Sequence, residues 1–233
     1  MIISLFLITL IYVLVALVLV GNVEASVLAT DIKPIYTLFQ SVGGNYFGYA
    51  AGVVGVITLM SMANSGVLAS SRFPFAMSKD KLMPSYLGKI SSKFLTPVPA
   101  ILTTSTIIGL AIVFLDVVKI AKLASAFKVL MFIFNEFGTI AGIGLWLSLL
   151  LKSAFSLVGL SAYLYVLIEV DSSLTKSIAL IALLVILLLN IFGVKKVEKT
   201  QLVIVSISIL SLILIIFLGF SSYDSCLLYT SPS

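Results

Sequence analysis

Long apolar runs, separated by short polar segments, make up most of this chain up to about residue 220. A run of about 20 apolar residues is long enough to cross a bilayer as an α-helix. The pattern therefore predicts an all-α, polytopic membrane protein with about seven transmembrane helices. The predicted spans are 3–21, 46–70, 98–115, 121–135, 138–167, 175–192 and 202–220.

Two of these spans are unusual. Span 121–135 is short and contains Lys122 and Lys128, which are expensive in a hydrocarbon environment. Span 138–167 is longer than a bilayer requires, so it would have to tilt or protrude from the membrane.

Composition supports the membrane assignment and excludes several kinds of chemistry. Hydrophobic residues make up 61% of the 233 residues, which a water-soluble domain could not bury, and charged residues make up 10%. The chain has no histidine, and its one cysteine is Cys226. Disulfides, thiolate or histidine metal sites and histidine catalysis are therefore not expected. Without paired intramembrane carboxylates either, we predict no enzyme activity and no cofactor.

The net charge of +5 is distributed as in a membrane protein rather than a nucleic-acid-binding one. Lysine and arginine concentrate in the loops 71–96 and 193–201, whereas the loops 22–45 and 168–174 contain most of the remaining acidic residues. Because basic loops stay on the cytoplasmic side, the first two loops are predicted to lie inside and the other two outside. This topology places the N-terminus inside and the C-terminus outside the cytoplasmic membrane.

The segment Ala63–Ala100, called the signature segment below, contains a recognisable motif. It resembles the signature that follows the eighth helix in the amino acid–polyamine–organocation (APC) transporter superfamily. The matching elements are Ala63-Asn64-Ser65-Gly66, Ser71-Arg72, Phe75-Ala76-Met77-Ser78-Lys79-Asp80, Leu82-Met83-Pro84 and Thr96-Pro97. The resemblance implies the five-plus-five inverted-repeat fold and secondary transport of amino acids or related amines across the lipid bilayer. It also implies alternating access driven by H⁺ or Na⁺.

The order of the elements differs from that of the family. Residues 1–134 resemble its seventh to tenth helices, and residues 135–225 resemble its third to fifth helices, so late helices precede early ones. The second resemblance rests on Phe137-Gly138, Ala141-Gly142, Trp146, Gly159, Tyr163-Leu164, Asn190-Ile191-Phe192-Gly193-Val194-Lys195 and 201–219. The family's first and sixth helices, which are broken and bind substrate, have no counterpart here.

We therefore expect a fragment or rearranged piece of a parent permease. The sequence of residues 226–233 looks like the translation of one reading frame of a sequencing-library adapter, with a chance polar tail as the alternative, so this tail is excluded from the predicted fold. The alternative interpretation is an inactive or scaffold membrane protein that transports nothing.

Candidate site residues lie inside two spans. Lys152, near the middle of the fifth span, would be a proton-coupling or substrate-site cation facing the bundle interior; alternatively, it bonds backbone carbonyls or snorkels to the interface. Thr58, Ser61 and Ser65 recur at helical spacing, and the resemblance implies that such hydroxyls can face a sodium site. We favour the simpler interpretation that they bond the preceding turn or pack between helices.

Small residues and prolines give further local predictions. Gly48 and Gly52, with Gly55 nearby, indicate close helix packing rather than a dedicated dimer motif, and so do Gly138 and Gly142. Gly43-Gly44 indicates a turn before a helix. Thr96 is predicted to cap a helix whose first turn holds Pro97, and Pro74 to stop or kink the second span. Trp146 is interpreted as a packing aromatic, with a substrate lid as the alternative.

Overall fold

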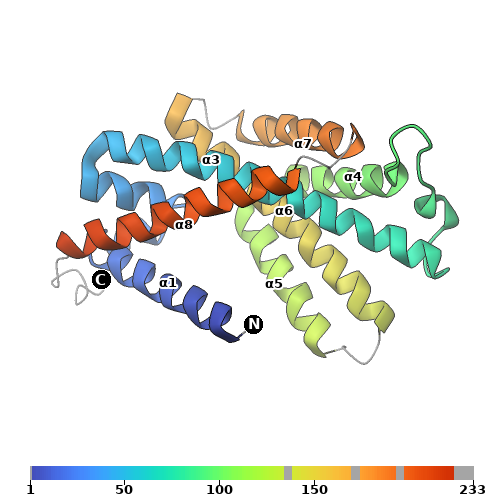
Figure 1. The fold of residues 1–233 in the computed structure, drawn as a ribbon, viewed down its shortest axis with the longest axis horizontal. Coiled ribbons are helices and arrows are strands. Elements are labelled where there is room, and N and C mark those ends of the chain that lie inside the picture. The colour runs from blue at the N-terminus through green and yellow to red at the C-terminus, as the bar shows by residue number, and fades with distance from the viewer. Residues whose placement is uncertain (1, 134–137, 169–173, 193–196, 223–233) are drawn as a thin grey trace. The chain divides into compact units, whose positions relative to one another are not determined.

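The computed structural model describes residues 2–133, 138–168, 174–192 and 197–222, without the side chains of 132, 138–140 and 197–200. In these ranges the chain forms eight α-helices and one short 3₁₀ helix (Figure 1). They are α1 (Ile2–Val20), α2 (Ala25–Leu28), α3 (Pro34–Lys79), η1 (Ser85–Gly88), α4 (Val98–Phe114), α5 (Val117–Ile133), α6 (Gly138–Ile168), α7 (Thr175–Phe192) and α8 (Val197–Ser221). One long helix overlaps each predicted span, which confirms the all-α fold.

Within the described ranges, five helices are long and apolar enough to cross a membrane, namely α1, α3, α6, α7 and α8. The protein is therefore a multi-pass membrane protein. Helix α4 is apolar but has 17 residues. Helix α5 is also 17 residues long and contains Lys119, Lys122 and Lys128. The short fourth span is thus the one that least resembles a membrane helix, as its lysines indicated.

The chain folds into two compact units. The first contains α1, α2, α3 up to Thr58, the end of α6 from Ala162 and α8 from Gln201. The second contains the rest of α3, the body of α6 and helices α4, α5 and α7. Each unit is described separately below.

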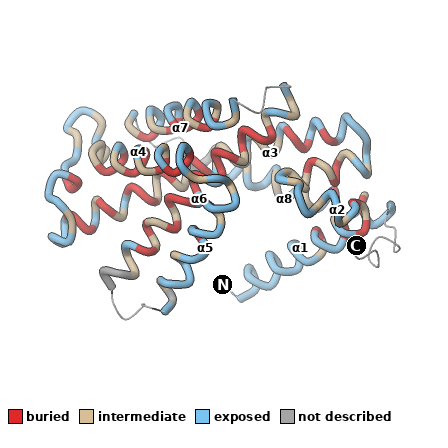
Figure 2. The backbone as a smooth tube through the Cα atoms, turned by 180° about the vertical axis from the view of Figure 1, so that it is seen from behind, coloured by how far each residue is buried: buried red, intermediate tan, exposed pale blue. Residues whose placement is uncertain are grey.

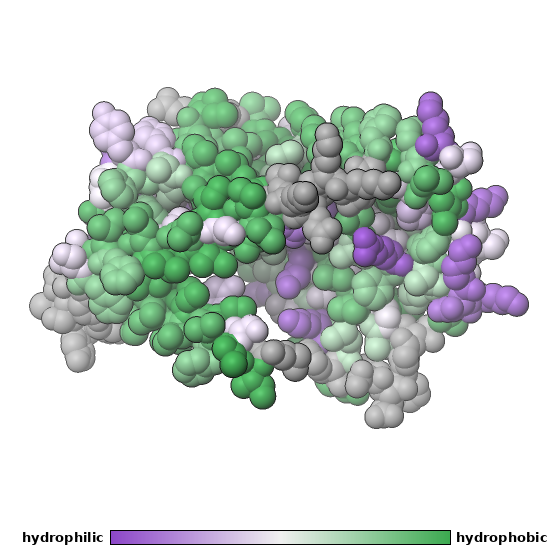
Figure 3. Space-filling model, in the orientation of Figure 1, coloured by the Kyte–Doolittle hydropathy of each residue, from purple (hydrophilic) through white to green (hydrophobic). Residues whose placement is uncertain are grey.

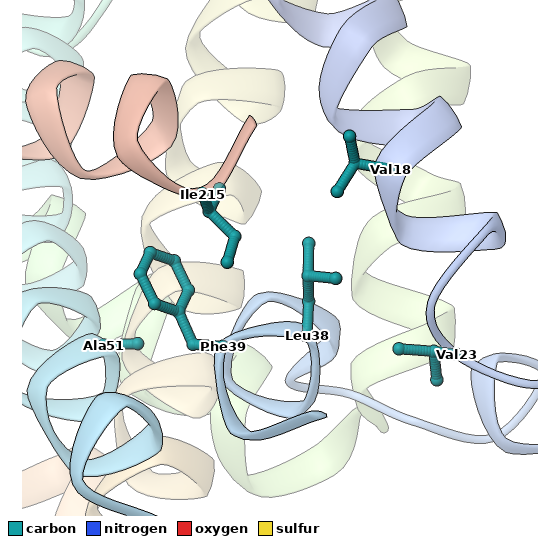
Figure 4. Close-up of a cluster of buried hydrophobic side chains, with 6 residues drawn as sticks. All are labelled: Val18, Val23, Leu38, Phe39, Ala51 and Ile215. Atoms are coloured by element: carbon teal, nitrogen blue, oxygen red, sulfur yellow. The ribbon is translucent and has the colours of Figure 1, made fainter. Parts of the chain in front are cut away.

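A cluster of apolar side chains from three helices forms the core of the first unit (Figure 4). Val18 of α1, Leu38 of α3 and Ile215 of α8 are fully buried in it. Between membrane helices such side chains stabilise the fold through van der Waals packing, because lipid tails are as apolar as they are. Where α1 ends, the Asn22 side-chain amide donates to the Gly219 carbonyl at 3.1 Å, which ties α1 to α8.

Residues 34–43, predicted as part of a loop, are helical and form the first segment of α3. Leu38 and Phe39 of this segment are buried in the core, and that tertiary packing stabilises a helix too short to span a membrane. The segment ends at a kink at Gly44, whose φ of 74° and ψ of −170° lie in a region open essentially only to glycine. The predicted glycine turn is therefore present, and it joins two helical segments.

Helix α6 lies at the centre of the second unit's packing and contacts both α3 and α5. A Cβ added to Gly66 of α3 would lie 2.2 Å from Ser153 Oγ of α6, so the Ser153 side chain packs directly against the backbone of α3 there. On α6 the Ser148 hydroxyl donates to the Ala124 carbonyl of α5 at 3.0 Å. Figure 2 shows the resulting concentration of buried residues along α3 and α6.

Helices α4 and α7 form the second pair in this unit and lie side by side (Figures 1 and 2). Gly109 of α4 faces the side chains of Leu180 and Leu183 on α7. The Lys176 ammonium of α7 donates to the Val113 carbonyl at 2.9 Å, and so binds one of the free carbonyls at the end of α4. The two helices are therefore antiparallel.

Two local features differ from the predictions. Pro74 does not stop the second span: helix α3 continues through it to Lys79, where Met77 packs against Gly142 of α6, and neighbouring helices support a proline inside a membrane helix. Helix α4 begins at Val98 with Pro97 as its N-cap residue, and the Thr96 hydroxyl instead donates to the Ile191 carbonyl of α7 at 3.2 Å. The basic loop consequently spans residues 80–97 rather than 71–96.

Surface polarity agrees with the membrane assignment. Side chains of α1 and α8 are mostly exposed and apolar, and this region is green in Figure 3. Hydrophilic side chains gather at the loop between α3 and α4, which is purple in the same view. Exposed apolar helices with a separate polar loop are typical of a protein that is surrounded by lipid.

Candidate functional site

The loop of the signature segment is folded tightly against the end of α3. The Ser78 hydroxyl donates to the Pro84 carbonyl at 2.8 Å, and the Leu82 backbone N–H donates to the Met77 carbonyl at 2.8 Å. A Cβ on Gly88 would lie 2.9 Å from Ser78 Oγ, so only glycine allows η1 to pack this closely. The residues that define the family resemblance therefore form a fixed structure at this end of the second unit.

The same segment holds the end of α7 through three contacts. Asn190 Nδ2 donates to Asn64 Oδ1 of α3 at 2.7 Å and to the Ile186 carbonyl at 2.9 Å. One residue further on, the Ile191 carbonyl accepts the Thr96 hydroxyl. At the last residue of α7, the rings of Phe192 and Phe94 meet edge to face, with centroids 5.3 Å apart.

This cluster joins the two parts of the sequence that the resemblance assigns to different ends of the family's chain. Asn64 and Thr96 belong to residues 1–134, whereas Asn190 and Ile191 belong to residues 135–225. Asn190 is buried and Asn64 is half-buried, and their bond between apolar helices satisfies polar groups that lipid could not satisfy. The cluster therefore fixes how α3, α4 and α7 fit together.

The charged residues of the signature segment point away from this cluster. Arg72, Lys79 and Asp80 are exposed, and the Lys79 ammonium lies 5.6 Å from the centroid of the Phe75 ring. Pro84 is also exposed, and its carbonyl binds Ser78. These residues are exposed, as expected at the polar surface of a membrane protein, and they do not enclose a catalytic site.

Of the predicted hydroxyl residues, Thr58 makes a contact between helices in the first unit. Thr58 Oγ1 of α3 lies 2.7 Å from Ser208 Oγ of α8. Each hydroxyl is also within bonding distance of a carbonyl one turn back, Val54 for Thr58 and Ile204 for Ser208. The two hydroxyls have only two protons for these three bonds, so one carbonyl loses its side-chain donor whenever the hydroxyls bond each other.

Beside this pair lies a small apolar cavity of about 30 Å³. Its lining residues are Val54, Ile57, Thr58, Ile204 and Ile207. A volume of this size admits one water molecule, but the apolar walls offer it few partners. The site has room for a hydroxyl rearrangement and none for an amino acid.

Ser65 makes the bonds that the simpler of the two interpretations predicts. The Ser65 hydroxyl donates to the Ser61 carbonyl at 2.8 Å and reaches the Met62 carbonyl at 3.1 Å. Ser61 itself is half-buried. Such bonds to the preceding turn are common for serine in apolar helices and require no ion.

Lys152 lies on α6 between the buried residues Leu151 and Ser153, and its own side chain is exposed. The predicted orientation toward the bundle interior is therefore not found in this structure. Within the described ranges no hydrogen bond or ion pair involves its ammonium group. Trp146, on the same helix, is buried, in agreement with a packing role.

The sequence analysis did not predict that Asn64, Asn190 and Ser208 make side-chain hydrogen bonds between helices. The available signal was the rarity of amide side chains inside apolar helices, where an unpaired amide is costly. No group of three or more acidic, cysteine or histidine residues suited to a metal ion occurs in the described ranges.

A family model for amino acid permeases matches residues 1–138, which is more than half of the chain. The chain belongs to the amino acid permease family. This result confirms the resemblance that the signature segment indicated. It also confirms that the protein comes from a family of transporters rather than enzymes.

The permease has curated relatives in Arabidopsis thaliana. It is 31% identical over 123 residues to "Cationic amino acid transporter 3, mitochondrial". These 123 residues are 53% of this chain and 20% of the relative. It is 26% identical over 123 residues to "Cationic amino acid transporter 4, vacuolar", with the same coverage. The chain thus spans about one fifth of the length of these relatives. No solved structure matches it with significance.

Proposed function

We propose that this permease chain derives from a secondary active transporter of amino acids or related amines. The observation that carries the proposal is the permease match over residues 1–138, which contains the complete signature segment. The named relatives are cationic amino acid transporters, which favours a basic amino acid such as arginine as the first substrate to test. The parent protein would lie in the cytoplasmic membrane with both basic loops inside.

The proposed mechanism is alternating access, in which packed groups of helices move against each other around a central substrate. In this mechanism the second unit, held by the Asn64–Asn190 pair and the Gly66–Ser153 contact, would be a rigid body. The exposed ammonium of Lys152 and the hydroxyl pair Thr58–Ser208 are the proposed coupling groups for H⁺ or Na⁺. No catalytic residue or cofactor takes part.

We further propose that residues 1–134 and 135–225 are a late and an early part of the family's chain joined in reversed order. Two observations support this: the family match stops at residue 138, and α3 and α4 of the first part pack with α6 and α7 of the second. Long-read sequencing across residues 134–137 and past residue 225 tests the join. A single read that contains both parts supports a rearranged gene, and reads that diverge there mark an assembly artefact.

The tail of residues 226–233, for which we propose an adapter origin, lies outside the described part of the structure. The same sequencing reads settle its origin. A genomic reading frame that differs after residue 225 is the expected result, and an unchanged frame would contradict the adapter interpretation.

The transport proposal is tested by uptake of labelled arginine into liposomes that contain either the intact parent permease or this chain alone. The intact parent should accumulate arginine against its gradient when an H⁺ or Na⁺ gradient is applied. We propose that the 233-residue chain alone accumulates none, because the broken helices that bind substrate in the family have no counterpart in it. Accumulation by the chain alone would contradict this part of the proposal.

A further inference from the structure

Asp31 is half-buried and lies in the first unit, just before α3 begins. Asp31 accepts the Lys33 backbone N–H at 2.9 Å on one oxygen and the Thr37 hydroxyl on the other. These two bonds fix the orientation of the carboxylate. The ion pair found in the described ranges joins Lys119 and Asp116, so Asp31 has no cation within salt-bridge distance there. A carboxylate held in this way can still attract one.

A buried aromatic ring lies one turn further along and already binds an ammonium group. The Lys33 Nζ atom is 4.8 Å from the centroid of the Tyr36 ring, which is within the range of a cation–π interaction. Tyr36 is only 6% exposed. A Cβ on Gly48 would lie 3.3 Å from the ring edge, so the fold-back at Gly44 holds the ring in place.

A tyrosine from the end of α6 completes the group. Tyr163 packs on Gly55 so closely that a Cβ there would lie 2.5 Å from its ring. Its hydroxyl lies in the neighbourhood of Asp31 and of the Tyr36 backbone. Three separate elements thus bring a ring face, a carboxylate and a hydroxyl together in the first unit.

We propose that Asp31, Tyr36 and Tyr163 form a binding site for a primary alkylammonium ion, and that Lys33 occupies the ring face of this site as a resident competitor. An aromatic face supplies the electrostatic attraction, and the carboxylate and hydroxyl accept the N–H bonds of the cation. Lys33 has a long flexible stem and is half-exposed, so its ammonium group can leave. The site requires no transport, and it goes beyond the function proposed above.

The test is a titration of the purified full chain, in neutral detergent, with n-butylammonium followed by ligand-observed NMR. This probe has the same head group and stem as lysine. Lys33→Met should raise its affinity about three- to tenfold by removing the competitor. Asp31→Asn should lower the affinity at least about tenfold. Glu24→Gln removes a charge from the same loop and should leave the affinity unchanged.

Butanol, which has the same stem without the charge, should not bind. An unchanged affinity in Lys33→Met, or equal effects of Asp31→Asn and Glu24→Gln, would overturn the proposal. If Asp31→Asn does not fold because Asp31 bonds the first turn of α3, the Lys33→Met titration decides alone. Because the readout is equilibrium binding, failure of this site leaves the transport proposal untouched, and failure of transport leaves the site untouched.

Discussion

The contact between Gly66 and Ser153 gives the sharpest prediction about stability. In Gly66→Ala the new Cβ would lie 2.2 Å from Ser153 Oγ, 3.2 Å from its Cβ and 3.7 Å from its Cα. The Ser153 hydroxyl can rotate only by giving up its 3.0 Å bond to the Leu149 carbonyl, and the Cβ contact at 3.2 Å remains. The Ser153 hydroxyl would therefore have to rotate away, and α6 would have to shift from α3 by a few tenths of an ångström.

The expected magnitude follows from two opposed effects. Overpacking a close contact destabilises a protein by about 1–3 kcal/mol. Alanine in place of glycine in a helix stabilises it by about 0.5–1 kcal/mol. The net loss for Gly66→Ala is thus expected to be about 1–2 kcal/mol. Ser153→Gly removes the opposing side chain, so the double variant should recover most of that loss.

The assay is unfolding in mixed detergent micelles of increasing denaturing fraction, followed by far-UV circular dichroism for the wild type, both single variants and the double variant. The double variant should be more stable than the sum of the single effects by about 1–2 kcal/mol, as expected for residues in direct contact. Gly109→Ala is the matched control, because its Cβ would meet Leu183 at an ordinary 3.5 Å. If Gly66→Ala is as harmless as Gly109→Ala, or if Ser153→Gly gives no rescue, the packing argument fails.

Three other changes test separate parts of the structure by unfolding or uptake. Gly44→Ala should destabilise the chain by about 1–3 kcal/mol, and Gly44→Asn by as much, because the φ of 74° with a ψ of −170° is closed to both; equal stability would contradict the kink. Asn190→Leu should cost about 1 kcal/mol by leaving Asn64 Oδ1 without its donor, and adding Asn64→Leu should restore most of it; the same unfolding assay decides. Lys152→Met in the intact parent should abolish ion-coupled uptake. It should change stability by less than about 0.5 kcal/mol, since the side chain is exposed, and retained coupling would refute its role.

Much of the helical architecture could be predicted because apolar run length is a direct consequence of bilayer thickness. The ends of α7 and α4 were predicted to within one residue. The errors occur where tertiary packing decides. Residues 34–43 are helical because Leu38 and Phe39 are buried, and α3 passes Pro74 because Met77 packs on α6.

The candidate site was less predictable, for the same physical reason. The preference of Ser65 for the preceding turn follows from local geometry and was predicted. The partner of Thr58 lies 150 residues away on α8, and periodicity within one helix carries no information about it. The exposure of Lys152 likewise depends on which helices surround α6, which its own apolar flanks do not determine.

We propose that two parts of a permease sequence, joined in reversed order, pack together as in a single transporter. Cross-linking of Asn64→Cys with Asn190→Cys by a short bifunctional thiol reagent tests it most directly, in a chain whose Cys226 is replaced by serine. Asn64 Oδ1 and Asn190 Nδ2 lie 2.7 Å apart, so cysteines at these positions should be bridged by the reagent in membranes, whereas Asn64→Cys with Leu184→Cys, on the exposed side of α7, should not. Equal cross-linking of both pairs, or none by the first, would contradict the account.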